Sequence, residues 1–510
     1  MSQQTLQRLA PETLEDIGDR VPVPAYDRSR VRTGIVHLGV GGFHRAHQAM
    51  YVDALMNASP GDDEVLGWGI TGVGVLPGDA RMAEVMRAQG GLYTLVVKHP
   101  DGHLEPRVIG SIVDYLHAPA QGEEVLDLMA APATRIVSLT VTEGGYHVNQ
   151  VTGDFDPDDA GIQHDLGLGA GELPTTAFGF VVEALARRRE AGVPAFTVMS
   201  CDNIQGNGHV AHQMIGAFAR LRDERQGTDL ADWIEREVVF ANSMVDRITP
   251  VTTDDDRAAL ADRFGVEDAW PVVCEPFTQW ALEDAFPTGR PAFEEVGVQV
   301  VPDVVPYELM KLRLLNASHQ ALCYPGYLAG HRYAHEVCHD PLFVDFLLGY
   351  MEHEGTPTLS EVPGVDLAQY RRQLIERFAN PEVRDTLARL CAESSDRIPK
   401  WLVPVITERL AAGGSVDRAA LVVASWARYA EGIDEQGEEI DVVDRRRDVV
   451  MQRAAAQLGE GADELAFLRD PALFGDLVDT PAFTGPYLAA LRSLHEVGAR
   501  ATLEAWAARG

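Results

Sequence analysis

Lysine is scarce in this 510-residue sequence. Only Lys98, Lys311 and Lys400 stand among the 43 basic residues, and the others are arginine. Arginine serves wherever a permanent positive charge is enough, because its guanidinium keeps its proton in proteins, whereas a lysine can lose one. A lysine inside a Leu-rich segment, as Lys311 is, is therefore a candidate for proton transfer.

Positive charge and cysteine are also in short supply. The 77 acidic residues outnumber the 43 basic ones and give a formal net charge of −34, which disfavours nucleic acid and anionic membrane as partners. The five cysteines are scattered and form no CxxC pair, so the sequence indicates neither a disulfide framework nor a thiolate zinc site.

Targeting and membrane segments are the third absence. The opening MSQQTLQRLAPETLED has no basic stretch followed by an apolar one, so we expect no signal peptide. No apolar run is long enough to span a bilayer. The sequence therefore predicts a cytoplasmic protein without a membrane partner.

A glycine-rich turn follows the first strand-like run. Residues 1–33 are expected to form a polar arm, and GIVHLGVGGFHRAH (34–47) then passes from β-branched residues through glycines towards a helix. Such a turn lets backbone N–H groups approach a pyrophosphate. The match to G-x-G-x-x-G is partial, because a histidine stands at the third glycine position. The cofactor-binding candidates here are Gly39, Val40, Gly41, Gly42, Phe43, His44, Arg45 and Ala46.

An acidic residue follows the second predicted strand, 68–75. Asp79 at this point could accept hydrogen bonds from ribose hydroxyls and repel a 2′-phosphate, which favours NAD over NADP. Alternatively, Asp79 caps the helix that begins at Ala80. The sequence leaves both interpretations open.

Polar turns follow the next predicted strands, 135–141 and 195–200. In doubly wound sheets, ligands lie at the carboxyl ends of the strands. Asn207, in the turn 201–208, is accordingly either a loop former or a ligand. Asp246, beside Arg247, is either half of a structural ion pair or an acceptor for a substrate hydroxyl.

The segment 308–319 (ELMKLRLLNASH) predicts a helix, because it lacks Gly and Pro and is rich in Leu and Met. Lys311, Asn316 and His319 interrupt its apolar run. At about 100° per residue they project at about 0°, 140° and 80°, on one broad side of the helix.

Lys311 is therefore either a base in apolar surroundings or a lysine whose stem packs while its head reaches water. To act near neutrality, its pKa would have to lie well below the ordinary value of about 10.4. Glu308, one turn earlier, either relays a proton to solvent or is a first-turn acid favoured by the helix dipole.

The pattern changes near residue 300. Four prolines interrupt residues 285–306, and helical periodicity prevails beyond them. We expect an α/β N-terminal Rossmann-type domain (1–300) that binds a dinucleotide. A mostly α-helical C-terminal domain (301–510) would bind substrate and carry the catalytic lysine.

Several stretches together resemble the mannitol dehydrogenase family, the long-chain polyol dehydrogenases that need no metal. The resemblance extends from about residue 30 to beyond residue 430. It implies NAD-dependent interconversion of a polyol and a ketose, typically mannitol and fructose, and favours a monomer. The stretches are GIVHLGVGGFHRAHQAMYVDAL, VSLTVTEGGY, FTVMSCDN followed by Asn207-Gly208, MVDRITP, DAWPVVCEPFTQW and KLRLLNASH.

The resemblance also implies roles. Lys311 resembles the general acid/base, and Asn207 and Asn316 resemble the two amides that hold the developing oxyanion. His319 resembles a residue that positions substrate. The residues that resemble contacts to the rest of the polyol are Asp246 and Arg389. No metal is expected, although His331, His335 and His339 have near-helical spacing.

Two departures keep alternatives open. Gly78-Asp79 stands where a family member has two adjacent acids, and Ser394-Ser395-Asp396-Arg397 where it has Ser-Ser-Lys. Arg397 and Lys400 could bind a carboxylate, as a fructuronate or tagaturonate reductase would require. An arabinitol dehydrogenase shares the architecture. A catalytically silent NAD sensor is a further alternative, although it would not need the complete set of polar residues.

Overall fold

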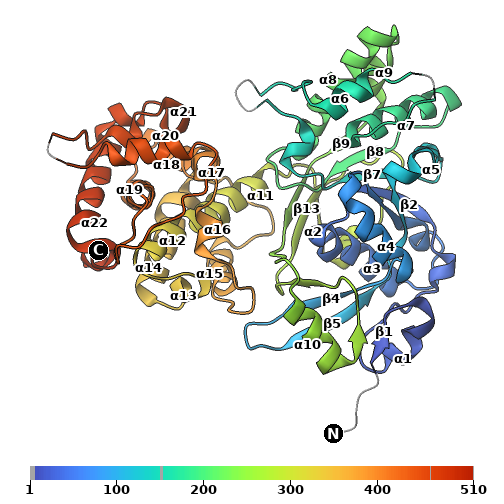
Figure 1. The fold of residues 1–510 in the computed structure, drawn as a ribbon, viewed down its shortest axis with the longest axis horizontal. Helices are drawn as coiled ribbons and strands as arrows, with labels where there is room; N and C mark the ends of the chain where they lie inside the picture. Colours follow the sequence, from blue (N-terminus) through green and yellow to red (C-terminus); the bar gives the residue numbers. More distant parts are fainter. Residues whose placement is uncertain (1–5, 150–152, 170, 460, 509–510) are drawn as a thin grey trace. The chain divides into compact units, whose positions relative to one another are not determined.

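The computed structural model describes residues 6–149, 153–169, 171–459 and 461–508. The chain divides into two compact units, Met1–Val304 and Val305–Gly510, which run from blue through green and from yellow to red in Figure 1. Among the described residues, no helix combines the length and the apolar character needed to cross a bilayer.

A six-stranded parallel sheet forms the centre of the first unit (Figure 1). Its spatial order is β6-β3-β2-β7-β8-β9, which is the strand order of the doubly wound dinucleotide-binding fold. The order reverses between β2 and β7, and ligands bind such folds at this switch point. The strands are β2 (Thr33–Leu38), β3 (Gly69–Gly74), β6 (Ile112–His117), β7 (Ile136–Leu139), β8 (Thr197–Ser200) and β9 (Phe240–Ala241).

Helices cover both faces of this sheet, which is why its strands are apolar on both sides. One face packs on α5, α7 and α8 through a core that includes Val36, Leu139 and Val198. The other packs on α3 and α4 through a core that includes Ile35 and Ile70. These helices are α3 (Gln48–Ala58), α4 (Ala80–Ala88), α5 (Ala118–Ala130), α7 (Ala177–Ala191) and α8 (Asn207–Gln226).

Shorter strands complete the first unit in three small sheets, with orders β12-β4-β5, β10-β13-β14 and β1-β11. These strands are β1 (Gln7–Arg8), β4 (Tyr93–Lys98), β5 (Leu104–Ile109), β10 (Ser243–Asp246), β11 (Val266–Glu267), β12 (Val272–Cys274), β13 (Gln279–Glu283) and β14 (Gln299–Val301).

The N-terminal segment is not the polar arm that its composition predicts. Leu9, Ile17 and Val21 are fully buried and pack with a small core that contains Leu92 and Val273. The helix α1 (Leu14–Gly18) lies in this segment, and so does β1, which pairs in parallel with the distant strand β11. The prediction was wrong because a few well-spaced apolar residues are enough to dock a short segment.

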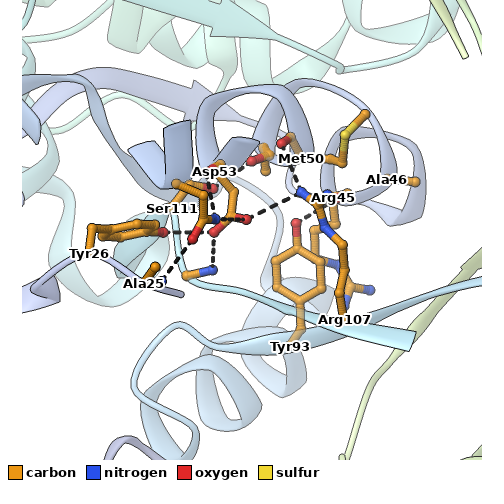
Figure 2. A network of polar contacts seen from close by, with 12 residues as sticks. Ala25, Tyr26, Arg45, Ala46, Met50, Asp53, Tyr93, Arg107 and Ser111 are labelled. Atoms are coloured by element: carbon orange, nitrogen blue, oxygen red, sulfur yellow. Dashed lines mark hydrogen bonds and ion pairs between the residues drawn. The ribbon is translucent and has the colours of Figure 1, made fainter. Parts of the chain in front are cut away.

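A buried carboxylate also ties this segment to the sheet region (Figure 2). Asp53 of α3 accepts hydrogen bonds from the Tyr26 hydroxyl (2.7 Å), the Gly110 N–H (2.8 Å) and Arg107 (3.3 Å). Burial is the main cause that raises the pKa of Asp53 above its ordinary range. The network joins three segments of the chain to α3. It therefore fixes the position of α3 and of the glycine-rich turn that precedes it.

The described part of the second unit is mostly helical. Its central helix α12 (Ala317–Leu328) is buried along nearly its whole length and carries Pro325 inside it. The other α- and π-helices are α11 (Val305–Met310), η7 (Lys311–Asn316), α13 (Ala334–Cys338), α14 (Pro341–Tyr350), η8 (Met351–Gly355), α15 (Leu367–Phe378), α16 (Leu387–Cys391), α17 (Ser394–Trp401), α18 (Val403–Ala411), α19 (Asp417–Tyr429), α20 (Arg447–Ala455), α21 (Pro471–Phe474) and α22 (Pro481–Ala507).

Candidate active site

The glycine-rich turn lies at the switch point of the parallel sheet. Gly39 has φ +94°, and a Cβ added there would lie 2.2 Å from the Thr140 carbonyl oxygen, so no other residue fits. At Gly41 and Gly42, by contrast, the nearest atoms to an added Cβ lie 3.9 and 3.6 Å away. The turn thus packs tightly against β7 at Gly39 and leaves space beside the next two glycines, as a pyrophosphate cradle requires.

His44 occupies the third glycine position by stacking on a second histidine. The His37 and His44 rings lie 3.5 Å apart with an interplanar angle of 6°, and both side chains are buried. His37 shares hydrogen bonds of 2.8 Å with Ser138 and Thr140. Burial lowers the pKa of His37 to about 3 and that of His44 well below its usual value. Both rings are therefore neutral. The flat, neutral ring of His44 packs closely at the position where the motif has its third glycine.

Arg45 faces the core of the first unit. Its guanidinium donates to the Trp270 carbonyl (2.5 Å) and lies over the rings of Tyr93 and Trp270. Its own carbonyl accepts from the Tyr93 hydroxyl (2.5 Å). The short helix α2 (Gly42–Ala46) is anchored in this way. Among the other candidates in the turn, Val40 and Ala46 are buried and Phe43 is half-buried.

Asp79 lies beside the carboxyl end of β3. Its carboxylate accepts from the Leu76 N–H (2.9 Å), and a Cβ on Gly74 would lie 2.5 Å from the Asp79 Cβ. Asp79 stands at the N-cap position of α4, but its side chain makes no capping hydrogen bond to that helix. The acid instead closes the turn at residues 76–79, at the edge of the sheet where a ribose binds in this fold.

A strained turn follows β7. Thr142 has φ +64° and ψ 169°, a region that residues other than glycine rarely adopt. The buried Asp202, just after β8, accepts from the N–H groups of Thr142 (2.8 Å) and Val141 (3.1 Å) and from the Tyr146 hydroxyl (2.8 Å). Burial raises the pKa of Asp202. Sequence reasoning had not singled out Asp202, although an acid directly after a buried strand was the available signal.

Asn207 connects three elements. It is the first residue of α8, it is fully buried, and its Nδ2 donates to the carbonyls of Asp202 (3.0 Å) and Ser243 (2.7 Å). Its Oδ1 accepts from the Ser243 N–H (3.0 Å). The amide thereby fixes the start of β10, and Asp246 is the buried last residue of that strand. Arg247 donates to the carbonyls of Glu275 and Ala46.

A π turn in the second unit changes the geometry expected for the catalytic helix. Residues Lys311–Asn316 form the π-helix η7 between α11 and α12, and the Ala317 N–H donates to the Leu312 carbonyl five residues back. A π turn advances by only about 80° per residue, so Asn316 projects at about 40° and His319 at about −20° from Lys311. The three polar side chains converge far more closely than a regular helix allows.

These side chains are buried. Lys311, Asn316 and His319 expose 8%, 6% and 8% of their surface, and Glu308, one turn before the lysine, exposes 4%. The Asn316 Oδ1 atom has no hydrogen-bond partner among the described residues. The His319 ring packs on Phe378 with centroids 4.6 Å apart. A buried amide with an unused oxygen is costly unless a ligand completes it, which is typical of a binding site.

The arginine and lysine candidates on α16 and α17 have protein partners. Arg389 donates two hydrogen bonds of 2.6 Å to Asp385, and its side chain is exposed. Arg397 donates to two main-chain carbonyls, of Arg389 and Leu390, and Lys400 pairs with Asp396 at 2.8 Å. The two cations invoked for a hexuronate carboxylate are thus already engaged within this unit.

The structure groups the candidates inside each unit. The first unit carries the dinucleotide turn, Asp79, Asn207 and Asp246, and the second carries Glu308, Lys311, Asn316 and His319 on one continuous helix. Within the described ranges, no three His, Cys, Asp or Glu side chains are arranged to hold a metal ion.

Known proteins match the chain over both units. Residues 33–295 match the mannitol dehydrogenase Rossmann domain and residues 303–495 the mannitol dehydrogenase C-terminal domain. Mannitol 2-dehydrogenase of Neosartorya fischeri is 47% identical over 463 residues, which cover 90% of each protein. That of Pyrenophora tritici-repentis is 46% identical over 492 residues, which cover 96% of this chain and 84% of the relative.

Solved structures agree with these matches. Pseudomonas fluorescens mannitol 2-dehydrogenase, in a ternary complex with NAD and D-mannitol, is 44% identical with a TM-score of 0.84, covering 99% of this chain and 100% of that one. A substrate-free D-sorbitol dehydrogenase is 36% identical with a TM-score of 0.87, covering 97% and 100%. Both the expected fold class and the resemblance drawn from the motifs are confirmed: the chain belongs to the mannitol dehydrogenase family.

Proposed function

We propose that this protein is an NAD-dependent, metal-independent polyol dehydrogenase that interconverts D-mannitol and D-fructose. The observation that carries the proposal is the π turn, which gathers Lys311, Asn316 and His319 into one sector of a buried helix. The similarity to mannitol 2-dehydrogenases over most of the chain supports the choice of substrate.

The first unit fits the cofactor. The turn after β2 is tight at Gly39 and open beside Gly41 and Gly42, which suits a pyrophosphate that approaches the backbone. Asp79 would accept from the adenosine ribose and disfavour the 2′-phosphate of NADP. When bound, NAD supplies the hydride acceptor, and its reduced form supplies the hydride for the reverse reaction.

The second unit supplies the proton chemistry. In oxidation, the neutral Lys311 amine takes the proton of the carbinol oxygen, and in reduction it returns that proton. The buried Leu314 and Leu315 follow it by three and four residues on the same helix, and apolar surroundings favour the neutral amine. The Nδ2 group of Asn316 donates to the same oxygen as negative charge develops on it. Glu308 relays the proton to solvent.

The remaining candidates hold the substrate. His319 donates to the substrate hydroxyl next to the reacting carbon. Asp246 and Arg389 bind hydroxyls farther along the carbon chain of the polyol. Asn207 is the second amide of the oxyanion site. Because both of its N–H groups already donate to carbonyls, the substrate oxygen would have to replace one of these acceptors.

Location and assembly belong to the same proposal. All five cysteines are unpaired buried thiols, which is typical of a reducing cytoplasm. The proposed form is a monomer.

The test is NADH oxidation with fructose, fructuronate, tagaturonate and xylulose in parallel, each with and without EDTA. We expect strong turnover with fructose that EDTA does not change. Identification of the sugar alcohol formed separates mannitol from sorbitol. Turnover only with a hexuronate or with xylulose would overturn the substrate, and loss of activity in EDTA would overturn the metal-free chemistry.

Lysine variants test the base. Lys311→Ala should lower kcat by several orders of magnitude while NADH still binds, and Lys311→Arg should be equally inactive because arginine keeps its proton. The matched control is Lys98→Arg, at a half-buried lysine that pairs with Asp256 at 2.6 Å. Full activity of Lys311→Arg would show that the lysine serves only as a fixed charge.

A further inference from the structure

The π turn that aligns the proposed catalytic residues requires support from outside its own helix. In a π turn each N–H bonds to the carbonyl five residues back, and in an α-helix to the carbonyl four residues back. A carbonyl at the change between these two spacings loses its helical donor and needs a donor from elsewhere. In η7, the Ala317 N–H bonds to Leu312 instead of Arg313, its α-helical partner four residues back. The carbonyl of Arg313 is therefore the one whose surroundings matter most.

That carbonyl meets a tyrosine hydroxyl. Tyr350, the fully buried last residue of α14, donates from its hydroxyl to the Arg313 carbonyl oxygen at 3.2 Å. Burial is the main cause that raises the pKa of Tyr350 well above its ordinary value, so the hydroxyl keeps its proton and acts as a donor. The hydrogen bond offers the carbonyl an alternative to the regular helical pattern.

Gly355 and the partners of the Arg313 side chain define the rest of its surroundings. A Cβ on Gly355, at the end of η8, would lie 3.2 Å from the Arg313 carbonyl oxygen and 2.9 Å from Leu314. The Arg313 side chain donates two hydrogen bonds of 2.7 Å to Glu408 and another to the Thr358 carbonyl. Main chain and side chain of Arg313 are thus held by segments far away in the sequence.

We propose that Tyr350 is a positioning residue for the proton-transfer site, which holds η7 in its π form and thereby keeps Lys311 and Asn316 on one side of the helix. The inference rests on the proposed function. Its geometric basis is the difference between the two helix types: in a regular helix Asn316 would project about 140° from Lys311, and in the π turn about 40°.

The test compares Tyr350→Phe with Tyr487→Phe. Each variant removes one buried hydroxyl from the second unit. Tyr487 lies on α22, and its hydroxyl donates to Gln457 at 2.6 Å. No contact among the described residues links it to η7, so Tyr487→Phe controls for the loss of a buried hydrogen bond. The assays are kcat and KM with fructose, the pH dependence of kcat/KM with mannitol, NADH binding, and amide hydrogen exchange of residues 311–317.

For Tyr350→Phe we expect kcat to fall about tenfold to a hundredfold, as for a small displacement of reacting groups. The rise of kcat/KM with pH should move to higher pH, because a mobile Lys311 reaches water and holds its proton more tightly. Exchange of residues 311–317 should become faster, and NADH binding should stay unchanged. Tyr487→Phe should show none of these effects.

Gly355→Ala is the second variant, in case Tyr350→Phe does not fold. The backbone of Gly355 is helical, so alanine adds no backbone strain, and its methyl group would crowd the Arg313 carbonyl oxygen and the Leu314 side chain. We expect the same shift in the pH profile. Wild-type kinetics and exchange in both variants would overturn the role of Tyr350. An inactive wild-type protein would overturn the proposed function instead, and hydrogen exchange would still decide whether Tyr350 holds the π turn.

Discussion

Replacing Glu354 with glutamine should change how the stability of the second unit depends on pH. Glu354 exposes 1% of its surface, and its two oxygens accept from the N–H groups of Arg418 and Ala419, each at 2.8 Å. Burial is the largest influence and raises its pKa from an ordinary 4.5 to about 7, against the opposing effect of the two hydrogen bonds. The group therefore titrates near neutrality in the folded protein.

The sign and size of the effect follow from the difference between the pKa values of Glu354 in the folded and the unfolded protein. Because the folded pKa lies above the unfolded one, the folded state binds more protons between pH 4.5 and pH 7. The stabilisation from this proton is fully present below pH 4.5 and is lost as the pH rises through 7. The difference of the two pKa values corresponds to about 3 kcal/mol. Glutamine does not titrate. Between acid pH and pH 8, the free energy of unfolding of the variant should therefore rise by this amount relative to that of the wild type.

Thermal unfolding at several pH values measures the gain. For a unit of this size, about 3 kcal/mol corresponds to a change of about 6–12 °C in the Tm difference between variant and wild type. Any constant cost of a lost hydrogen bond cancels in this comparison. Glu352→Gln, at an exposed side chain of the same turn, is the control. The same Tm difference at pH 4.5 and pH 8 would refute the reasoning, because Glu354 would then be ionised throughout.

Three shorter predictions concern the rest of the molecule. Gly39→Ala should abolish NADH binding, measured by fluorescence titration, because its Cβ would collide with Thr140; Gly78→Ala, with no atom within 4 Å of the added Cβ, should bind normally. Asn316→Ala should lower kcat about a hundredfold with little change in Tm, since its Oδ1 has no partner among the described residues. His37, whose pKa is lowered to about 3, stays neutral in the folded protein while the unfolded chain takes up a proton below about pH 6.5. Stability should therefore fall by about 1.4 kcal/mol per pH unit from pH 6.5 towards pH 3 on its account, and acid titration of His37→Asn should show a shallower slope.

The sequence predicts the class of the fold better than the limits of its elements. Alternating strands and helices followed by helical periodicity predict the α/β unit and the helical unit, because these patterns are local. The helical periodicity of residues 440–457 predicts one helix, yet the helix α20 begins only at Arg447, and the Ile440 N–H bonds instead to the Gly432 carbonyl. The periodicity of residues 399–412 likewise predicts one helix, and the structure divides this segment between α17 and α18 at Leu402. Such limits depend on contacts between distant segments, which local periodicity does not contain.

In the candidate site, too, the sequence identifies some residues and does not identify the contacts between distant segments. The glycine turn and Lys311 stand out in the sequence because glycine and a lone lysine carry chemical meaning by themselves. The hydrogen bonds of His37 to Ser138 and Thr140 and those of Asp202 do not, because each joins residues that lie far apart in the sequence. The strand order that places Thr140 against Gly39 is likewise a property of the whole sheet.

The π turn was missed for a different reason. The segment 308–319 contains no glycine or proline, so local propensity predicts a regular helix, and the extra residue in the turn depends on Tyr350, Gly355 and Glu408. Yet the spacing itself contains a signal. In a regular helix, residues that share a face are three or four apart, whereas Lys311 and Asn316 are five apart. Five is the hydrogen-bond spacing of the π-helix, which occurs mostly as single turns at functional sites. A base and an amide five residues apart in a buried apolar helix therefore indicate a π turn, if both must reach the same substrate oxygen.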